Sequence, residues 1–261
     1  MQSDKNERIQ LVSRSLKILA AFHGRNEPLG ISEISRRTNI PKSSAHRIVE
    51  ALIENGSLIN VNEKSEVMIA DKNASLGDSF LEQNTYLQEA LPLMQEVAEK
   101  EHISIALGQY HRGHMVCVQY CSSSVTSTLR QRIGSLVPVL DTSMGKAYLL
   151  AEAPERALQI LTEIEDVPDE KAHSIIQEAA DFCSQHGYVK AVGLWSEELI
   201  SVGTPLTATK LTPPMGLTCI TRREYVEEEE FETRVGKSVQ NLANDIEALF
   251  VKQSLESATG N

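Results

Sequence analysis

Residues 40–58 read IPKSSAHRIVEALIENGSL, and this stretch decides the fold of the N-terminal part of the chain. Its apolar residues recur at steps of three and one, which predicts a helix with one buried face; they are Ala45, Ile48, Val49, Leu52 and Ile53. Pro41 suits the first position of this helix, where its missing N–H costs nothing. Lys42, His46 and Arg47 stand beside two serines at the helix start. Cations and hydroxyl groups in this position are typical of a surface that lies against phosphates and base edges.

Two shorter helical patterns come before this stretch. The first ends near Gly24 and has an apolar face at helical spacing, formed by Val12, Leu16, Leu19 and Ala20. In the second, Ser32 is placed to cap the helix, Glu33 suits the first turn, and Ile34 is expected to point inward. The chain therefore begins with three short helices, of which the third is the candidate recognition helix.

Two β-like runs follow, at residues 57–61 and 66–70, around the polar tip 62–65. This pattern predicts a hairpin of the kind called a wing. Three helices followed by such a hairpin make a winged helix-turn-helix.

A long helical pattern comes next and leads into a body of alternating strand and helix signals. Its apolar rhythm predicts a seam between two copies of the chain, built from Leu76, Phe80 and Leu87. Pro92 is expected to divide this pattern into a linker helix and the first helix of the body. We therefore predict three parts: residues 1–72, 73–91 and 92–261. Helices on the faces of a sheet, with one pocket, are the expected body.

The charge of the chain is divided unevenly. Residues 1–60 hold 9 Lys+Arg and 6 Asp+Glu, a net charge of +3, whereas the remaining residues hold 16 and 30, a net charge of −14. A basic head on an acidic body can bind DNA with the head alone. No apolar run is long enough for a membrane span, and residues 1–10 do not read as a signal peptide, so we expect a cytoplasmic protein with no membrane partner.

Cysteine and histidine spacing gives no indication of a metal site or a cofactor. The four cysteines form neither a CxxC pair nor a finger pattern with histidine, and we expect buried, reduced thiols at Cys117, Cys121, Cys183 and Cys219. The acidic run at 227–230 reads as a solvated helix start.

Several segments together resemble one family. LVSRSLKILAAF, ISEISRRTNIPKSSAHRIVEALIENGSL, DTSMGKAYLLAE, QHGY and SEELISVGTPL occur in this order and at these distances, as they do in the IclR family of bacterial transcription regulators. The resemblance covers roughly residues 9–250. It implies an α+β protein with an N-terminal winged helix-turn-helix, a linker helix and a C-terminal GAF-like α/β effector-binding domain. It also implies a homodimer, or a tetramer of paired dimers, that binds double-stranded operator DNA.

The candidate DNA contacts lie in the three predicted helices and the wing. Arg47 is expected to pair with guanine, and Lys42 with a phosphate. The chain departs from the family pattern in the recognition helix, at Ser44 and Ala45, and in the wing, where Met68 replaces a frequent arginine. Lys64 at the wing tip is the expected substitute. The full predicted set is Arg14, Arg36, Arg37, Lys42, Ser43, Ser44, His46, Arg47 and Lys64.

The candidate effector site begins at the sequence DTSMGKA. Thr142 or Ser143 is expected to cap the following helix, whose free N–H groups near Met144 and Gly145 would form an anion hole. An ordinary helix start with Gly145 packed against a strand is the alternative. The resemblance implies that this turn lines the effector pocket and adds Ser196, Leu206, Cys219 and Thr221. Trp195, the only tryptophan, is predicted either to stack on a ligand or to pack in the core.

We therefore predict a regulator, not an enzyme, that responds to a small carboxylate effector. The presence of Leu206 favours a ligand with an apolar or aromatic portion. Two other functions remain open: a GAF-like thiol oxidoreductase with Cys219 as its thiol, joined to a nucleic-acid module, and an architectural DNA binder that takes no ligand.

Overall fold

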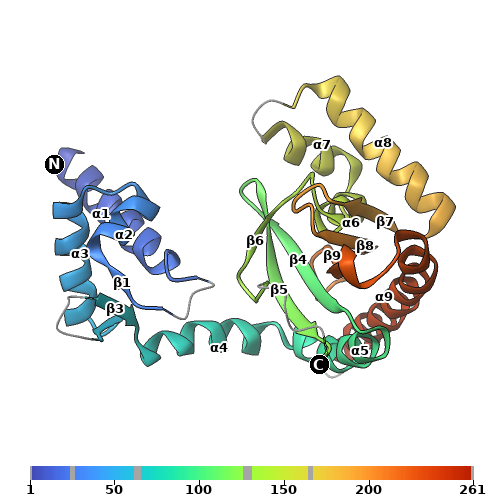
Figure 1. Cartoon of the computed structure of the whole chain (residues 1–261), viewed down its shortest axis with the longest axis horizontal. Coiled ribbons are helices and arrows are strands. Elements are labelled where there is room, and N and C mark those ends of the chain that lie inside the picture. The colour runs from blue at the N-terminus through green and yellow to red at the C-terminus, as the bar shows by residue number, and fades with distance from the viewer. Residues whose placement is uncertain (1, 24–26, 62–65, 126–130, 164–166, 260–261) are drawn as a thin grey trace. The chain divides into compact units, whose positions relative to one another are not determined.

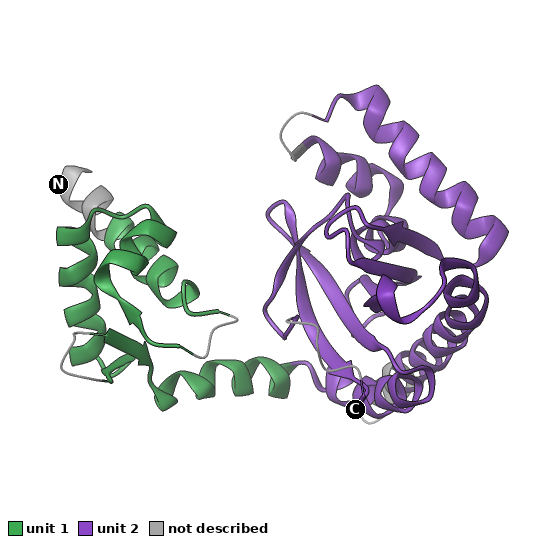
Figure 2. Ribbon diagram, in the orientation of Figure 1, with its two compact units in different colours: residues 1–83 green, residues 84–261 purple. Residues whose placement is uncertain are grey.

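The computed structural model describes residues 2–23, 27–61, 66–125, 131–163 and 167–259 (Figure 1). The chain divides into two compact units, Met1–Gln83 and Asn84–Asn261 (Figure 2). Each unit has its own hydrophobic core.

The first unit is a bundle of three helices beside a small sheet. Its elements are α1 (Gln2–Ala20), β1 (Leu29–Gly30), α2 (Ile31–Thr38), α3 (Lys42–Glu54), β2 (Leu58–Asn60), β3 (Glu66–Ile69), the 3₁₀ turn η1 (Asp71–Asn73) and α4 (Ala74–Gln83). Asn39 adopts the left-handed conformation, at φ 55°, that ends α2 and that asparagine tolerates better than most residues. Pro41 then stands at the N-cap of α3, one residue earlier than its expected position.

The apolar face of α1 differs from the prediction. Val12 and Leu16 are each 61% exposed, whereas Ile18 and Phe22 are buried with Ile34 of α2 in the core of this unit. The helix contributes to the core near its C-terminal end, where the predicted Leu19 also packs, partly buried, against it. The prediction was wrong for Val12, Leu16 and Ala20, which are exposed, because the same spacing also fits the exposed side of the helix.

The start of α2 also differs from the prediction. Gly30 is the N-cap, and no side chain caps the helix, so Ser32 lies inside the first turn. The reason is that strand β1 carries the extended chain up to Gly30, where it pairs with Glu66. Strand β1 has only two residues, which is too short to give a periodic signal in the sequence.

The predicted wing is confirmed as an antiparallel pair. Strand β2 lies beside β3, with Leu58 opposite Ile69 and Asn60 opposite Val67, and the sheet has the order β1-β3-β2. Residues 62–65, including the predicted phosphate contact Lys64, lie outside the described residues.

The predicted helix break at Pro92 is wrong. Helix α5 (Thr85–Glu101) contains Pro92, and the chain leaves helical geometry at Asn84 instead, with φ −124° and ψ 56°. A proline removes one helical hydrogen bond, but α5 is held by packing, since Leu87 and Met94 are fully buried in the core of the second unit. Leu87 therefore cannot form an exposed seam with Leu76 and Phe80 of α4.

The second unit is a six-stranded antiparallel sheet with helices on both faces (Figure 1). After α5 its elements are β4 (Ser104–His111), β5 (His114–Ser122), β6 (Leu136–Pro138), α6 (Ser143–Ala151), α7 (Pro154–Glu163), α8 (Asp169–His186), β7 (Val189–Val192), β8 (Leu199–Leu206), β9 (Met215–Arg222), the 3₁₀ turn η2 (Arg223–Tyr225) and α9 (Glu228–Thr259). The strand order is β6-β5-β4-β9-β8-β7. Helices α5 and α9 pack on one face, and α6, α7 and α8 lie on the other. This architecture confirms the expected α/β body.

Helix α6 approaches the backbone around it unusually closely. A Cβ atom added at Gly145, in the first turn of the helix, would lie 2.0 Å from the carbonyl oxygen of Val139. One added at Gly216, on β9, would lie 2.0 Å from the carbonyl oxygen of Met144. Real Cβ atoms do not approach oxygen so closely, so only glycine allows α6 to lie this deep.

Gly145→Ala should therefore lower the free energy of unfolding by about 1–3 kcal/mol, the usual cost of overpacking. The control is Gly77→Ala in α4, where an added Cβ would meet no atom within 4 Å. Alanine there should be neutral or should stabilise by roughly 0.5–1 kcal/mol, because glycine is unfavourable inside a helix. Urea unfolding followed by circular dichroism compares the two. An unchanged midpoint for Gly145→Ala would contradict the close approach.

Candidate functional site

Helix α3 separates its apolar and polar residues by face. Ala45, Ile48 and Val49 are buried in the first unit. The opposite side is polar and exposed, with Ser44 half-buried at its margin; its exposed residues include Lys42, Ser43, His46, Arg47 and Glu50. The face therefore presents cations and hydroxyl groups at the beginning of the helix, as the sequence predicted, and a carboxylate one turn further on.

The two arginines of α2 are both paired with Glu33. Arg36 donates through Nε and Nη2 at 2.8 and 2.7 Å, and Arg37 donates through Nε at 2.6 Å. These hydrogen bonds lower the pKa of Glu33 from its ordinary value of 4.5 to about 2. Because the pair favours the ionised carboxylate, Glu33 stays charged far into the acid range.

The two arginines differ in what else they can reach. Arg37 is 20% exposed and also donates through Nη1 to the carbonyl oxygen of Ala21, at 3.1 Å, so it ties α2 to the end of α1. Arg36 is 71% exposed. Arg36 is thus the better placed of the two for a phosphate, and Arg37 has an architectural role that the sequence did not indicate. Arg14, on α1, is half-buried.

A cavity lies in the second unit beside the start of α6, with a volume of about 30 Å³ for the centres of water-sized molecules. Five of the predicted ligand residues line it: Thr142, Ser143, Met144, Trp195 and Ser196. The remaining lining residues are Gln131, Val137, Asp141, Ala191, Gly193, Leu194, Leu199, Ser201, Thr218 and Ile220. The described lining contains no lysine, arginine or histidine.

The start of α6 offers fewer free donors than predicted. Thr142 caps the helix: its Oγ1 accepts the Gly145 N–H at 3.1 Å and donates to the carbonyl oxygen of Pro138 at 2.7 Å. Gly145 is packed against Val139, so it gives no ligand access to the backbone. The prediction that Gly145 forms part of an anion hole is therefore wrong. The N–H groups of Ser143 and Met144, which have no carbonyl partner within the helix, remain as donors.

Three predicted ligand residues lie on the wrong face of the sheet. Leu206 and Cys219 are fully buried in the core beneath α5 and α9, and Thr221 lines a separate cavity that includes Glu101 and Arg234. Side chains alternate along a strand, so an error of one residue moves a side chain to the opposite face.

The strand residues that do line the cavity were missed. They are Leu199, Ser201, Thr218 and Ile220. The hydroxyl groups of Ser143 and Thr218 lie 2.7 Å apart. Ser201 and Thr218 could have been noticed in the sequence, because a hydroxyl group within an otherwise apolar strand needs a polar partner when it is buried.

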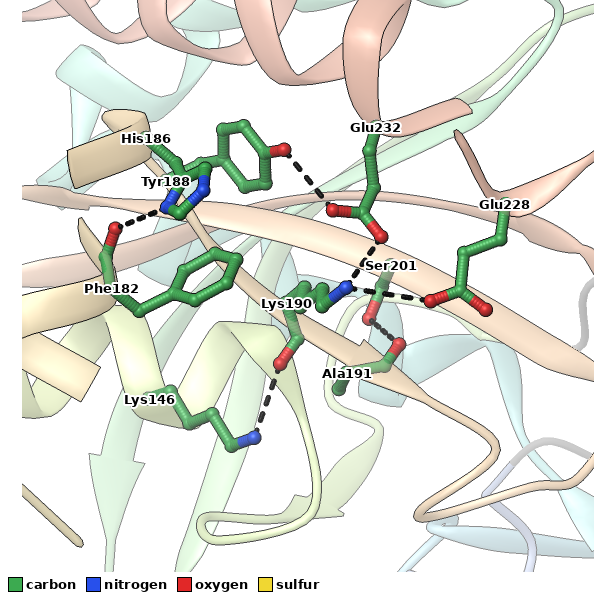
Figure 3. Close-up of polar contacts among 9 residues, drawn as sticks. All are labelled: Lys146, Phe182, His186, Tyr188, Lys190, Ala191, Ser201, Glu228 and Glu232. Atoms are coloured by element: carbon green, nitrogen blue, oxygen red, sulfur yellow. Dashed lines mark hydrogen bonds and ion pairs between the residues drawn. The ribbon is translucent and has the colours of Figure 1, made fainter. Parts of the chain in front are cut away.

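Two lysine side chains make polar contacts that connect strand β7 to neighbouring helices (Figure 3). Lys146 of α6 donates to the carbonyl oxygen of Lys190 on β7, at 3.1 Å, and burial lowers the pKa of Lys146. The Lys190 side chain pairs with Glu232 of α9 at 2.6 Å and with Glu228 at 3.4 Å. Strand β7, which contributes Ala191 to the cavity, is therefore fastened to helices on both faces of the sheet.

The cysteine environments do not favour thiol chemistry. Burial raises the pKa of Cys219 and also raises the pKa values of Cys117 and Cys121 to about 12. A reactive thiol needs the opposite shift. Among the residues that the structure describes, no three His, Cys, Asp or Glu side chains gather as a metal site would require. Within the same residues, no helix is long and apolar enough to cross a membrane.

Comparison with known proteins identifies the family. Residues 11–58 match the IclR helix-turn-helix domain, and residues 79–248 match the C-terminal domain of the bacterial transcriptional regulator IclR. The chain belongs to the IclR family. Its winged first unit and its second unit, with the α6 cavity, correspond to these two IclR domains.

Several named relatives within the IclR family are transcriptional regulators. The chain is 21% identical over 155 residues to the transcriptional repressor IclR of Escherichia coli K12, a match that covers 59% of this chain and 57% of that protein. It is 23% identical over 214 residues to the glycerol operon regulatory protein of Streptomyces coelicolor, covering 78% and 82%. The match thus spans little more than half of the E. coli repressor.

Solved IclR-family structures share the fold. A regulator from Brucella abortus superposes with a TM-score of 0.71 at 24% identity, over 95% of each chain. An IclR homologue from Microbacterium hydrocarbonoxydans, solved in complex with 4-hydroxybenzoate, superposes with a TM-score of 0.70 at 19% identity, over 91% of this chain and 98% of that one.

Glu33→Gln should lower the melting temperature of the first unit at pH 7, because it removes the charge that both arginines share. The folded pKa of Glu33 lies below its ordinary value, so this contribution is complete above pH 4.5 and is lost as the pH falls toward 2. Melting curves of the wild type and the variant should converge in acid. Glu54→Gln on α3, which removes the same charge elsewhere in the first unit, is the control. A constant difference between pH 7 and pH 3 would contradict the assignment.

Proposed function

We propose that this chain is a ligand-responsive transcription regulator that binds double-stranded operator DNA through helix α3 and takes a small carboxylate effector in the α6 cavity. Helix α3 carries the proposal, because its exposed face gathers Lys42, Ser43, His46 and Arg47 opposite a face buried in the core. A recognition helix places its N-terminal residues on base edges in the major groove. The net charge of +3 in residues 1–60, on a chain of net charge −11, favours the same surface.

We propose that the chain acts as a homodimer, or as a tetramer of dimers. One recognition helix gives too little contact for a specific operator, whereas a two-fold pair reads a palindrome. Exposed apolar side chains support this, since they lie on α1 at Val12 and Leu16 and on α4 at Leu76 and Phe80. In each helix the two residues are one turn apart and form an exposed apolar pair, which is typical of an interaction surface.

The effector chemistry follows from the cavity lining. The N–H groups of Ser143 and Met144, at the positive end of α6, suit a carboxylate. Leu194, Trp195 and other apolar lining residues favour an aromatic or similar medium-sized body. The 4-hydroxybenzoate bound by the Microbacterium homologue has this chemistry.

The two other functions have less support. A thiol oxidoreductase would need Cys219 accessible and acidic, but this thiol is fully buried and burial raises its pKa. An architectural DNA binder would take no ligand, so the α6 cavity would have no function in such a protein.

Arg47→Ala should weaken binding to the operator by about 1–3 kcal/mol and relax the preference at one base position in each half-site. Lys42→Ala should weaken binding to all DNA sequences alike and reduce the dependence of affinity on salt. Both effects are measured by fluorescence anisotropy, with one duplex that carries the operator sequence obtained by selection from a random library and one duplex in which that sequence is scrambled. If both variants bind both duplexes as the wild type does, helix α3 is not the reading helix.

A ligand panel tests the cavity. 4-Hydroxybenzoate should raise the melting temperature more than 4-hydroxybenzamide, because the amide lacks the charge that the start of α6 favours. At a ligand concentration 100 times Kd, a bound ligand increases the free energy of unfolding by about 2.7 kcal/mol relative to the ligand-free protein. Other acid–amide pairs extend the series. Trp195→Ala should reduce the stabilisation, whereas Tyr225→Ala, an exposed aromatic outside the cavity, should not. Equal stabilisation by acids and amides would contradict the carboxylate, and a full effect in Trp195→Ala would place the ligand elsewhere.

A further inference from the structure

Glu50 lies in the middle of the exposed stripe of α3. Seven residues make almost two turns of a helix, so Ser43 and Glu50 differ by only about 20° around the axis. His46 and Arg47 flank this line on its two sides, and the buried Ala45 and Ile48 lie on the other side of the helix. The Glu50 side chain is 59% exposed. A carboxylate therefore stands at the centre of the face that is proposed to meet DNA.

A carboxylate at this place needs an explanation, because DNA is a polyanion and each phosphate would repel it. The repulsion is avoided if the carboxylate points between the two backbones, at the base edges. Ser43 and Glu50 are about 10 Å apart along the helix axis, which corresponds to roughly three base pairs of DNA. Glu50 is thus close enough to the start of α3 to reach bases when Ser43 and Arg47 do.

The hydrogen-bonding pattern of the bases limits what Glu50 can contact. An ionised carboxylate only accepts hydrogen bonds. In the major groove, guanine and the O4 atom of thymine offer acceptors, whereas the amino group of cytosine is a donor that suits aspartate and glutamate. Adenine places an acceptor beside its amino group and suits an amide better. A carboxylate in this position therefore selects cytosine.

His46 is placed to position the carboxylate. Its Nδ1 lies 3.4 Å from Oε2 of Glu50, one helical turn away, and the two side chains are similarly exposed. This contact restricts the Glu50 side chain before DNA arrives, which reduces the entropy lost on binding. A pair that served only to stabilise the helix would contribute a few tenths of a kcal/mol and would not affect base preference.

We infer that Glu50 is a specificity-determining residue that accepts a hydrogen bond from a cytosine amino group in each half-site, with His46 as its positioning residue. This inference rests on the proposed binding of DNA by α3. It also gives the carboxylate a second effect: Glu50 weakens binding to unrelated DNA, where its charge is not compensated. Glu50 thereby increases the ratio of specific to non-specific affinity.

Selection from a randomised duplex library tests this directly, with the full-length wild type, Glu50→Ala, Glu50→Gln and Glu54→Ala. The wild type should select a palindrome with a cytosine at one fixed position of each half-site. Glu50→Ala should lose that preference, a change of roughly 5- to 100-fold at this position alone, and should bind random duplex more tightly. Glu50→Gln should move the preference from cytosine to adenine, which an amide reads through two hydrogen bonds.

Glu54 is the matched control, since it is an exposed glutamate near the same stripe, one turn further from the start of α3. Glu54→Ala should remove the same charge and leave every base preference unchanged. A wild type that selects no sequence would overturn the proposed function and this inference with it. A wild type that selects a palindrome, with both Glu50 variants selecting the same one, would overturn the inference alone. Glu50→Gln keeps the side-chain shape, so the test stands even if the alanine variant folds poorly.

Discussion

The seating of α6 on the sheet is the contact on which the second unit depends. Because Gly145 has no side chain, the first turn of the helix can pack directly against the backbone of Val139. For the same reason, β9 at Gly216 can contact the backbone carbonyl of Met144. The same turn follows the Thr142 cap and contains Ser143 and Met144, which line the cavity. Because a methyl group added at either glycine would overlap backbone atoms, the position of this first turn is set by backbone packing and not by side-chain choice.

The first unit holds the cationic face of α3 in a fixed orientation without burying its charged groups. Helix α3 buries Ile48 and Val49 and leaves Lys42 and Arg47 in solvent. Around it, charges are neutralised locally: Glu33 binds both arginines of α2, and one of these arginines also joins two helices.

The sequence was informative where a periodic signal was long and uninterrupted. It predicted α3, the wing and the long strands, because each has a clear spacing of apolar residues. It failed on β1, which has too few residues for a pattern, and on Pro92, because packing of Leu87 and Met94 outweighs the lost hydrogen bond. The family resemblance placed Cys219 in the cavity, which Thr218 lines instead, and the sequence could not correct this because the face of a doubly buried strand cannot be read from a run that is apolar on both sides.

Strand β7 closes one edge of the sheet, and it also forms part of the cavity wall through Ala191. An edge strand can detach without breaking the pairs among the inner strands, so its opening costs less than global unfolding. The contacts that resist this opening, beyond the pairing with β8, include the Lys146 hydrogen bond and the Lys190 ion pairs. Local opening at this edge would expose the Ala191 side of the cavity while the core beneath α5 and α9 stays intact, and the Lys146 and Lys190 contacts oppose that opening.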